Sequence, residues 1–423
     1  MFLTHTNVIR GLTKTEYAML GEMCLYSNNL YNVALYNIRQ HYFDTKQFLR
    51  YESNYHECKC NENYGLLQAG VSQQTLRVVD RSFKSFFNLI KKARSGDYRF
   101  CDIKMPHYRK KGGMFVLVFS TNAITIKNGY FLVPQSRAFS KLHNGKNIRI
   151  PFPKRLEGKT IKEVRILPVN HGQYYKIQYV YVQEEEPQDL DTSKALGIDL
   201  GVDNLATCVP SVGTPFIIDG RKLKSINRYW NKQKAYYQAI ADHQGIKGGK
   251  TKRICSLTAK RNNQVKDTIR KASRYIVNYC ISHDIGILVV GYNEGFKRNS
   301  NLGKKNNQNF VQLPLGDLRQ GLQYLCERYG IQYIEQEESY TSKSSYLDND
   351  VLPVYKAEQP YAGAFSGKRI YRGLYKSANG TTINADVNGA ANILRKAKVN
   401  GYPFGLPDSG CLAHPLRISF SQG

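Results

Sequence analysis

The sequence predicts a multidomain α+β protein, and three changes of pattern along its 423 residues support this fold class. Apolar side chains recur at helical spacing through residues 11–99 and then alternate with period two through residues 100–183. An acidic, proline-containing stretch at 184–194 breaks the composition and is typical of a linker between domains. Strands alternate with helices after it, which predicts an α/β domain, and the chain is long enough for two or three domains.

Two helices are expected near the N-terminus, at residues 14–44 and 71–94, because apolar residues recur there at helical spacing with few breakers. The second helix also carries basic residues outside its apolar stripe, including Arg77 and Arg81. These side chains are suited to contact a phosphate backbone, whereas a solvated basic face on a helix hairpin is the common alternative. The net charge of the chain favours the contact.

Residues 100–183 are expected to form an all-β module of about five to seven strands. Alternating apolar residues mark the segments 115–119, 123–133, 161–167 and 174–182. An Asn-Gly pair inside the second segment predicts a tight hairpin turn.

The stretch GIDLGVDNLAT at 197–207 is the most informative one in the second half. Asp is depleted in strands, so the presence of Asp199 inside a predicted strand suggests a specific role. Alternation puts it on one face with Gly197 and Gly201, and puts apolar side chains on the other face. The glycines are expected to leave room for hydrated metal ions and a phosphodiester backbone. A β-bulge with an incidental Asp is the alternative.

The remaining expected elements of the second half are strands at 216–219, 285–290 and 331–338, and helices at 224–243, 254–284, 314–328 and 383–397. The helix 254–284 is dense in basic residues, which suggests a nucleic-acid channel, and a lysine-rich loop follows at 297–310. The nucleic-acid contacts predicted in this region are Lys260, Arg261, Arg270, Lys271, Lys304 and Lys305.

The charge balance indicates a polyanionic partner. Lys and Arg number 61 against 33 acidic residues, which gives a net charge of +28. Nucleic acid is the first candidate, since each basic residue placed on a phosphate releases counterions, and an anionic membrane surface is the second. No apolar run approaches the ~20 residues of a spanning helix, and no signal peptide is evident. Nine cysteines without a paired framework fit a reducing cytoplasm, so a soluble intracellular protein is expected.

Asp386 is the second carboxylate in an unusual setting. It falls in the first turn of a helix that continues with Gly389, Ala390 and Ala391, which are small enough for close packing on a sheet. Close packing would bring Asp386 toward the end of the Asp199 strand as a metal ligand. The alternative is a favourable interaction with the helix dipole, worth ~0.3–1 kcal/mol. Two-metal phosphodiester hydrolysis needs at least three such acids, with the ions ~3.5–4 Å apart.

The order GIDLGVDNLAT, IGILVV, SYTSKSS and NADVNGAANI resembles the TnpB family, transposon-encoded RNA-guided DNA nucleases related to the type V CRISPR effectors. The resemblance covers nearly the whole chain and implies its domains. They are a β-barrel wedge domain (1–10 and 100–183), a helical recognition domain (11–99), a linker (184–194), an RNase H-like (RuvC) nuclease domain (195–339 and 384–397), a target-nucleic-acid-binding insertion (340–383) and a tail (398–423).

The resemblance implies cleavage of double-stranded DNA that pairs with a guide RNA beside a short motif read by the protein. It also implies two Mg²⁺ ions, with Mn²⁺ as a substitute, a monomer or weak dimer, and a place in the prokaryotic cytoplasm at the nucleoid. A nuclease-dead RNA-guided repressor is the alternative function. A guide-free resolvase or transposase is a weaker one, because the N-terminal part is large and basic.

Carried over from the family, Asp199 is the first nuclease carboxylate and Asp386 the third. Most of the family has a Glu after the IGILVV strand, but here Gly291 stands in that place. We predict that Glu338, with Glu337 as the alternative, supplies the second carboxylate from the strand 331–338. Only one of the two can face Asp199, and the other should be solvated or paired with a lysine. Glu294, in a Gly-flanked loop, is the rival.

The family's zinc ribbon is also missing. Residues 340–383 contain no Cys or His, so no zinc is expected. The segment should instead be held by packing of Tyr346, Leu347, Tyr355, Phe365, Ile370, Tyr371 and Tyr375.

Overall fold

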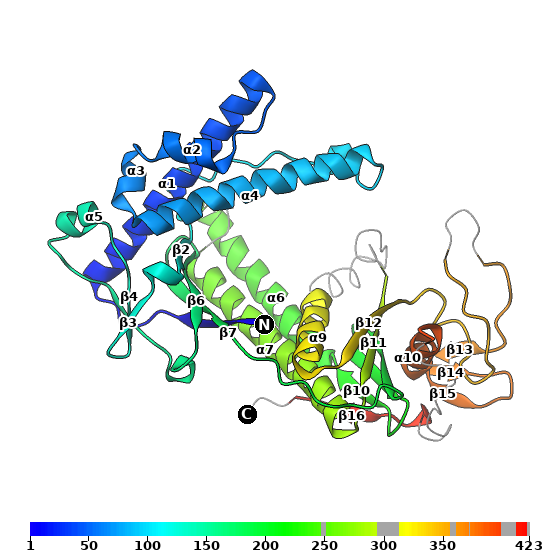
Figure 1. The fold of residues 1–423 in the computed structure, drawn as a ribbon. Helices are drawn as coiled ribbons and strands as arrows, with labels where there is room; N and C mark the ends of the chain where they lie inside the picture. Colours follow the sequence, from blue (N-terminus) through cyan, green and yellow to red (C-terminus); the bar gives the residue numbers. More distant parts are fainter. Residues whose placement is uncertain (247–250, 294–312, 356–360, 372, 399–411, 421–423) are drawn as a thin grey trace. The chain divides into compact units, whose positions relative to one another are not determined.

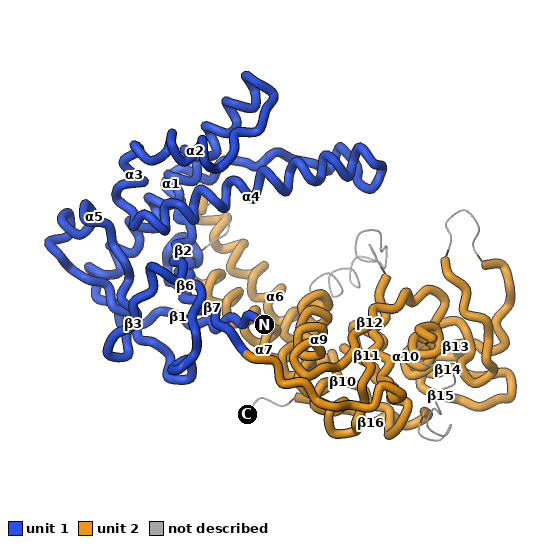
Figure 2. Tube along the Cα trace, viewed as in Figure 1, with its two compact units in different colours: residues 1–183 blue, residues 184–423 orange. Residues whose placement is uncertain are grey.

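The computed structural model of the chain describes residues 1–423 except 247–250, 294–312, 356–360, 372, 399–411 and 421–423 (Figure 1). The chain forms two compact units, unit 1 at Met1–Gln183 and unit 2 at Glu184–Gly423 (Figure 2). Both units combine helices and sheets, which confirms the predicted α+β class.

The helices of unit 1 confirm both predicted helical segments. Their bounds are α1 (Lys14–Thr45), α2 (Tyr51–Cys58), α3 (Glu62–Leu66), α4 (Ala69–Arg94) and α5 (Arg137–Leu142), with single 3-10 turns at Phe100–Asp102, Thr121–Ala123 and Lys154–Leu156. A capping box begins α1: the Thr13 side chain accepts from the Glu16 N–H at 3.2 Å, and the Glu16 carboxylate accepts from the Thr13 N–H at 2.8 Å.

The strands of unit 1 form two sheets. A four-stranded antiparallel sheet has the order β1-β7-β6-β2, and a three-stranded sheet has the order β3-β4-β5. The predicted Asn128-Gly129 turn joins β3 to β4, with both residues at positive φ. The bounds are β1 (Phe2–Val8), β2 (Leu117–Ser120), β3 (Thr125–Lys127), β4 (Tyr130–Leu132), β5 (Arg149–Pro151), β6 (Ile161–Val169) and β7 (Tyr174–Val182).

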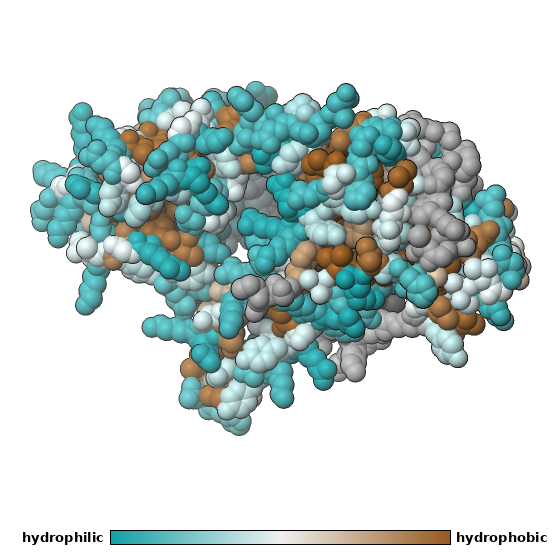
Figure 3. Space-filling view, turned by 90° about the horizontal axis from the view of Figure 1, so that it is seen from below, coloured by the Kyte–Doolittle hydropathy of each residue, from teal (hydrophilic) through white to brown (hydrophobic). Residues whose placement is uncertain are grey.

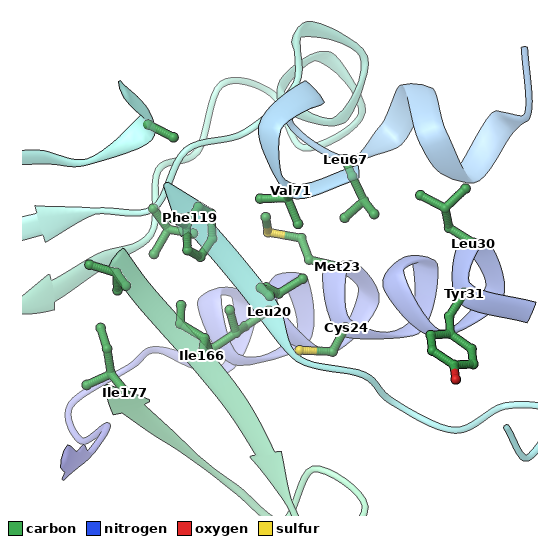
Figure 4. Packing of buried hydrophobic residues seen from close by; sticks show 14 of the residues in the cluster. Leu20, Met23, Cys24, Leu30, Tyr31, Leu67, Val71, Phe119, Ile166 and Ile177 are labelled. Atoms are coloured by element: carbon green, nitrogen blue, oxygen red, sulfur yellow. The ribbon is translucent and has the colours of Figure 1, made fainter. Parts of the chain in front are cut away.

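The core of unit 1 lies between its long helices and the four-stranded sheet (Figure 4). Leu20, Met23 and Cys24 of α1 are fully buried in it. Phe119 of β2 and Ile166 of β6 meet them from the sheet. Removing such side chains from water is the main stabilising term of a domain this size.

Unit 2 is built on a six-stranded sheet with the order β12-β11-β8-β9-β10-β16. The strands β8, β11 and β12 are parallel to one another, whereas β8, β9 and β10 pair antiparallel in a meander. The prediction that β11 and β12 are neighbours joined by a helix is confirmed. The bounds are β8 (Ala195–Leu200), β9 (Asn204–Pro210), β10 (Phe216–Asp219), β11 (Ile287–Tyr292), β12 (Gln332–Glu337) and β16 (Leu416–Ile418).

Helices cover both faces of this sheet (Figure 1). Leu196 and Ile198 of β8 pack in one cluster with residues of α7 and α9, which confirms the predicted apolar face. On the other face Leu394 of α10 packs beside Ala195. The bounds are α6 (Arg221–His243), α7 (Lys252–Ser282), α9 (Leu315–Tyr329) and α10 (Ala385–Lys396).

The insertion contains a small antiparallel sheet of β13 (Lys368–Tyr371), β14 (Leu374–Lys376) and β15 (Thr382–Asn384). The predicted packing is confirmed for Tyr346, Leu347, Phe365 and Tyr375 and wrong for Tyr355, Ile370 and Tyr371. Tyr375 is buried and Tyr346 and Leu347 are half-buried against the core, but Tyr371 is 76% exposed. Tyr355 and Ile370 are exposed too, and Phe365 is half-buried beside other rings.

Hydrogen bonds from α10 also hold the start of the insertion. Asn388 donates to the Ser344 carbonyl at 2.8 Å and accepts from the Tyr346 N–H at 2.9 Å. Asn392 donates to the Thr341 and Ser344 carbonyls at 2.9 and 2.7 Å. Both amides are fully buried, so these bonds satisfy groups that water does not reach.

The acidic stretch 184–194 lies along unit 2. The Glu186 and Gln188 N–H groups donate to the Arg328 and Tyr329 carbonyls, each at 2.9 Å. Lys194 pairs with Asp284 at 2.8 Å. The stretch is therefore hydrogen-bonded to unit 2 rather than a free linker.

The surface agrees with the high charge of the chain. Hydrophilic side chains cover much of the face drawn in Figure 3, with hydrophobic ones in separate patches. Across the helices that the structure describes, we find none with the length and apolar character needed to span a membrane.

Candidate active site

Asp199 lies near the end of β8 and faces α10. A Cβ atom at Gly389 of α10 would lie 2.8 Å from the Asp199 Oδ2 atom, so only glycine lets the helix approach this closely. A Cβ at Gly197 would lie 2.7 Å from the Ala390 carbonyl oxygen. The predicted close packing of the small helix residues is confirmed. The predicted role of the flanking glycines is wrong, because Gly197 makes room for α10 and Gly201 for the Asn204 carbonyl.

Asp386 sits in the first turn of α10, as predicted. The Asn384 side chain caps the helix by accepting from the Asp386 N–H at 3.0 Å. The Asp386 carboxylate accepts from Asn204 Nδ2 at 2.6 Å and from Arg369 Nη2 at 3.1 Å. Asp386 is therefore anchored on both sides, by an amide from β9 and by a guanidinium from the insertion.

Glu338 follows the last residue of β12 and reaches back over β11. A Cβ atom at Gly291 would lie 2.6 Å from the Glu338 Oε2 atom. The Glu338 carboxylate thus occupies the space beside the position where a side chain at residue 291 would begin. Glu294, the rival, lies outside the described residues.

Glu337 points to a different partner. Its carboxylate accepts from Lys396 Nζ at 2.5 Å and from the Ser339 N–H at 2.6 Å. The expectation that one of the two neighbouring glutamates pairs with a lysine is met by Glu337 and Lys396. Burial raises the pKa of Glu337, but its bonds to Lys396 and Ser339 outweigh burial, so this pKa is lowered.

Asp199 and Glu338 lie in surroundings that disfavour their charge. Burial, then the charges of Glu338 and Asp386, raise the pKa of Asp199 well above its ordinary value, while Arg369 opposes the shift. Burial and the charge of Glu337 raise the pKa of Glu338 to about 7, against the influence of Arg319 and Lys396. A bound cation would relieve this repulsion.

A pocket of about 630 Å³ opens beside Asp199 and Asp386. Three acids line it, Asp199, Asp203 and Asp386, together with four cations: Arg221, Lys224, Arg369 and Arg417. Carboxylates bind metal ions, and Arg and Lys side chains bind phosphate oxygens. A wall that carries both kinds of side chain suits a phosphodiester substrate. Arg369 was missed by sequence reasoning, because nothing in KRIYRG marks it as a partner of Asp386.

The donor set fits a hard divalent cation, which prefers carboxylate oxygens. Within the described ranges, however, no group of three or more His, Cys, Asp or Glu side chains gathers closely enough to hold a metal ion. The charges of Glu338 and Asp386 both act on Asp199, while Arg369 pairs with Asp386. The assignment of these three as metal ligands therefore remains a proposal.

The predicted nucleic-acid contacts fall into different settings. Lys260, Arg270, Arg77 and Arg81 are exposed, and Lys271 pairs with Asp267 at 2.9 Å. Lys304 and Lys305 lie outside the described residues. These seven residues keep their assignment as predictions.

Arg261 has a structural role. It donates to the buried Asn227 of α6 at 2.7 Å and lies 5.3 Å from the centre of the Trp230 ring. Burial lowers its pKa. Arg261 therefore links α7 to α6. It was predicted as a phosphate contact, and the sequence did not indicate these bonds to α6.

Comparison with known families gives two matches. Residues 178–297 match the OrfB_IS605 family, described as "Probable transposase", and residues 316–393 match the family described as "Cas12f1-like, TNB domain". The second match runs from α9 to α10 and so includes Glu337, Glu338, Arg369 and Asp386.

Two curated relatives match this chain, one named TnpB-like and one named Cas12f1. The TnpB-like protein ORF457 of Acidianus two-tailed virus is 26% identical over 212 residues, which are 48% of this chain and 42% of that relative. The CRISPR-associated endodeoxyribonuclease Cas12f1 of Sulfoacidibacillus thermotolerans is 25% identical over 366 residues, 80% of this chain and 79% of that protein.

The fold has a solved counterpart. The cryo-EM structure of a Cas12f1-sgRNA-target DNA complex contains a chain that matches 90% of this one over 83% of its own length, with a TM-score of 0.59 and 14% identity. The family matches and the relatives agree with the motif order and with the fold. The chain is similar to the TnpB-like and Cas12f1 proteins, which agrees with its resemblance to the TnpB family and the related type V CRISPR effectors.

Proposed function

We propose that this chain is a guide-RNA-directed endonuclease that cleaves double-stranded DNA beside a short motif read by the protein. Its similarity to the TnpB family and the names of its relatives support RNA guidance and DNA cleavage. The net charge of +28 supports a nucleic-acid partner. The partners are then a guide RNA and a target duplex, bound by a monomer or weak dimer in a prokaryotic cytoplasm.

The observation that carries the proposal is the position of Glu338 beside Gly291. The family's second carboxylate is expected at 291, where this chain has none. A carboxylate that reaches the same space from β12 restores an acid near Asp199. This favours an active nuclease over a nuclease-dead repressor.

In the proposed site Asp199, Asp386 and Glu338 would hold two Mg²⁺ ions, with Mn²⁺ as a substitute. When bound, such ions activate a water molecule and stabilise the leaving oxygen. Asn204 fixes the Asp386 carboxylate by its hydrogen bond at 2.6 Å. Arg369, which donates to Asp386 Oδ1 at 3.1 Å, is positioned to donate instead to a phosphate oxygen of the substrate, because a guanidinium group binds carboxylate and phosphate oxygens alike.

The other parts of the chain take the roles that the family resemblance implies. The strands of unit 1 form the wedge domain and its helices the recognition domain. The insertion 340–383 contacts target nucleic acid without zinc. The cations exposed on α4 and α7, including Arg77, Arg81, Lys260 and Arg270, contribute phosphate contacts.

The test begins with RNA that co-purifies with the protein. Sequencing it identifies the guide, and a duplex library with randomised flanks then reports cleavage with Mg²⁺. The proposal expects cuts that require both the guide match and a flanking motif. Guided DNA binding without cleavage at any Mg²⁺ or Mn²⁺ concentration would establish the repressor instead.

A further inference from the structure

Lys396, the last residue of α10, is a buried cation outside the proposed metal ligands. Its side chain is only 6% exposed. Its ammonium group donates to Glu337 Oε2 at 2.5 Å, to the Ser339 carbonyl at 2.9 Å and to the Pro353 carbonyl at 3.0 Å. An ammonium group has three N–H donors, so all of them are used.

Two of these acceptors stand on either side of Glu338. Glu337 precedes it and Ser339 follows it, and the Ser339 N–H also donates to the Glu337 carboxylate at 2.6 Å. The Glu338 carbonyl accepts from the Thr341 hydroxyl at 2.9 Å. The main chain at Glu338 is therefore fastened on both sides.

This fastening matters because the sheet does not supply it. The last register pair between β11 and β12 is Tyr292 with Glu337, so Glu338 lies beyond the ladder. A residue just past a strand end is free to turn unless other bonds fix it. Lys396 makes two of the bonds that fix this one, to Glu337 and to the Ser339 carbonyl.

The same helix places the other parts of the site. α10 carries Asp386 in its first turn and Gly389 against Asp199, and it contacts β8, β11 and β12 along its length (Figure 1). Ile393 lies over Gly291. One rigid element thus sets Asp386 directly and sets Glu338 through Lys396.

We propose that the ion pair of Lys396 and Glu337 is a positioning device that holds Glu338 toward Asp199 for metal binding. This inference rests on the proposed function, because it concerns how the second carboxylate of that site is held. Glu337 then acts as a positioning residue and not as a metal ligand. A carboxylate moved from β11 to the free end of β12 needs such support, since ligands must be held to within about 0.5 Å.

The test compares Lys396→Met with Lys396→Arg and with the control Lys398→Met. Methionine keeps the aliphatic stem and loses the N–H donors. Arginine keeps a cation that can donate to Glu337 and to the Ser339 carbonyl. Lys398 is exposed just past the same end of α10. Lys398→Met therefore changes the net charge as Lys396→Met does, without removing a buried ammonium group. Electron paramagnetic resonance measures Mn²⁺ binding to the full chain without RNA, with Asp199→Ala as the blank, and cleavage gives the Mg²⁺ concentration for half-maximal rate.

The proposal expects Lys396→Met to weaken Mn²⁺ binding and raise the half-maximal Mg²⁺ concentration by about 10–100-fold, the usual cost of losing support behind a metal ligand. Guided DNA binding should stay within about twofold, and Lys396→Arg should recover most of the metal affinity. Metal affinity in Lys396→Met equal to that of the Lys398→Met control would overturn the inference.

Two further results distinguish a failure of this inference from a failure of folding or of the proposed function. If Lys396→Met does not fold, Glu337→Gln keeps the shape and the lysine contacts, and it should shift both metal measurements in the same direction by a smaller factor. Unchanged values in a folded Glu337→Gln protein would count against the positioning role. If the wild-type protein with its guide neither cuts DNA nor binds Mn²⁺ above the Asp199→Ala blank, the proposed function itself fails.

Discussion

The Glu338 Oε2 atom lies 2.6 Å from the position that a Cβ atom at residue 291 would take. Real Cβ contacts are longer, so a side chain at residue 291 would require the end of the Glu338 or Ile393 side chain to shift. We predict that Glu338 of β12 supplies the second carboxylate in place of a side chain at 291.

Gly291→Ala should therefore destabilise the fold and impair cleavage. The added methyl group meets Glu338 Oε2 and, at 2.5 Å, Ile393 Cδ1, and overpacking of this kind costs about 1–3 kcal/mol. Chemical unfolding of the full chain measures the loss. Gly316→Ala in α9, where a Cβ meets no atom within 4 Å, is the control and should not lower stability. Equal stability of the two variants would show that the close contact does not exist.

Arg369→Ala should lower guided cleavage by about 100-fold, as expected for loss of a cation on the transferred phosphate, and should leave guided DNA binding nearly unchanged. Burial, Glu338 and Asp386 raise the pKa of Asp199, and Arg369 opposes them. Its removal should therefore move the acid limb of the cleavage profile to higher pH. Lys368→Ala removes the same charge from the exposed neighbour. An identical pH profile in both variants would contradict the role of Arg369.

Glu338 should make the metal-free protein less stable as pH rises. Its folded pKa of about 7 lies above the ordinary value of 4.5, so the folded state binds the proton more tightly than the unfolded state. Its contribution is fully present below pH 4.5 and is lost as pH rises through about 7. Glu338→Gln should remove this pH dependence. The free energy of unfolding should then change between low and high pH by at most about 2–3 kcal/mol less than in the wild type. Unfolding at several pH values in chelator measures it, and parallel curves for both proteins would refute the raised pKa.

The insertion should contain no zinc and should depend on α10 amides. Asn392→Ala removes two buried hydrogen bonds and leaves the Thr341 and Ser344 carbonyls without that donor, at a cost of about 2–4 kcal/mol. Limited proteolysis should then cut within 340–383 sooner than in the wild type. Lys368→Ala, at an exposed position of β13 in the same segment, is the control. Stoichiometric zinc by elemental analysis, or unchanged proteolysis, would contradict this account.

The basic residues of α7 should separate by function. Lys260→Ala and Arg270→Ala should flatten the salt dependence of nucleic-acid binding, because both side chains are exposed. Arg261→Ala should instead lower stability by about 1–3 kcal/mol, since it leaves the buried Asn227 oxygen without its donor. Binding titrations at several salt concentrations and thermal unfolding distinguish the two effects. A stable Arg261→Ala protein with a reduced salt slope would reverse the assignment.

Periodicity was sufficient to predict the long elements of both units. Helices such as α1 and α7 and strands such as β7 follow from the spacing of their apolar residues. The short helices α2, α3 and α5 are not predicted, because their local signals are weak and packing decides them. The strand β16 was missed as well, since its parallel pairing with β10 is a contact between distant segments.

The site divides in the same way. Asp199 and Asp386 stand out because an acid in a strand and small residues on a helix are local anomalies. Alternation also predicts that Glu337 and Glu338 face apart. Arg369 and Lys396 were not found, because their importance arises from what lies opposite them in the fold. The rings of the insertion were predicted only in part, since Tyr375 is buried and Tyr371 is exposed, and composition does not tell which rings are covered.

The most direct test of the relocated carboxylate compares alanine substitutions at residues 199, 294 and 338 in the protein loaded with its guide. Cleavage of a matched duplex with Mg²⁺ and affinity for the same duplex are measured in parallel. The account predicts that Asp199→Ala and Glu338→Ala lose cleavage and keep DNA affinity within about twofold, because phosphate contacts elsewhere supply the binding, while Glu294→Ala cuts normally. A Glu338→Ala protein that cuts like the wild type, with activity lost in Glu294→Ala instead, would contradict it.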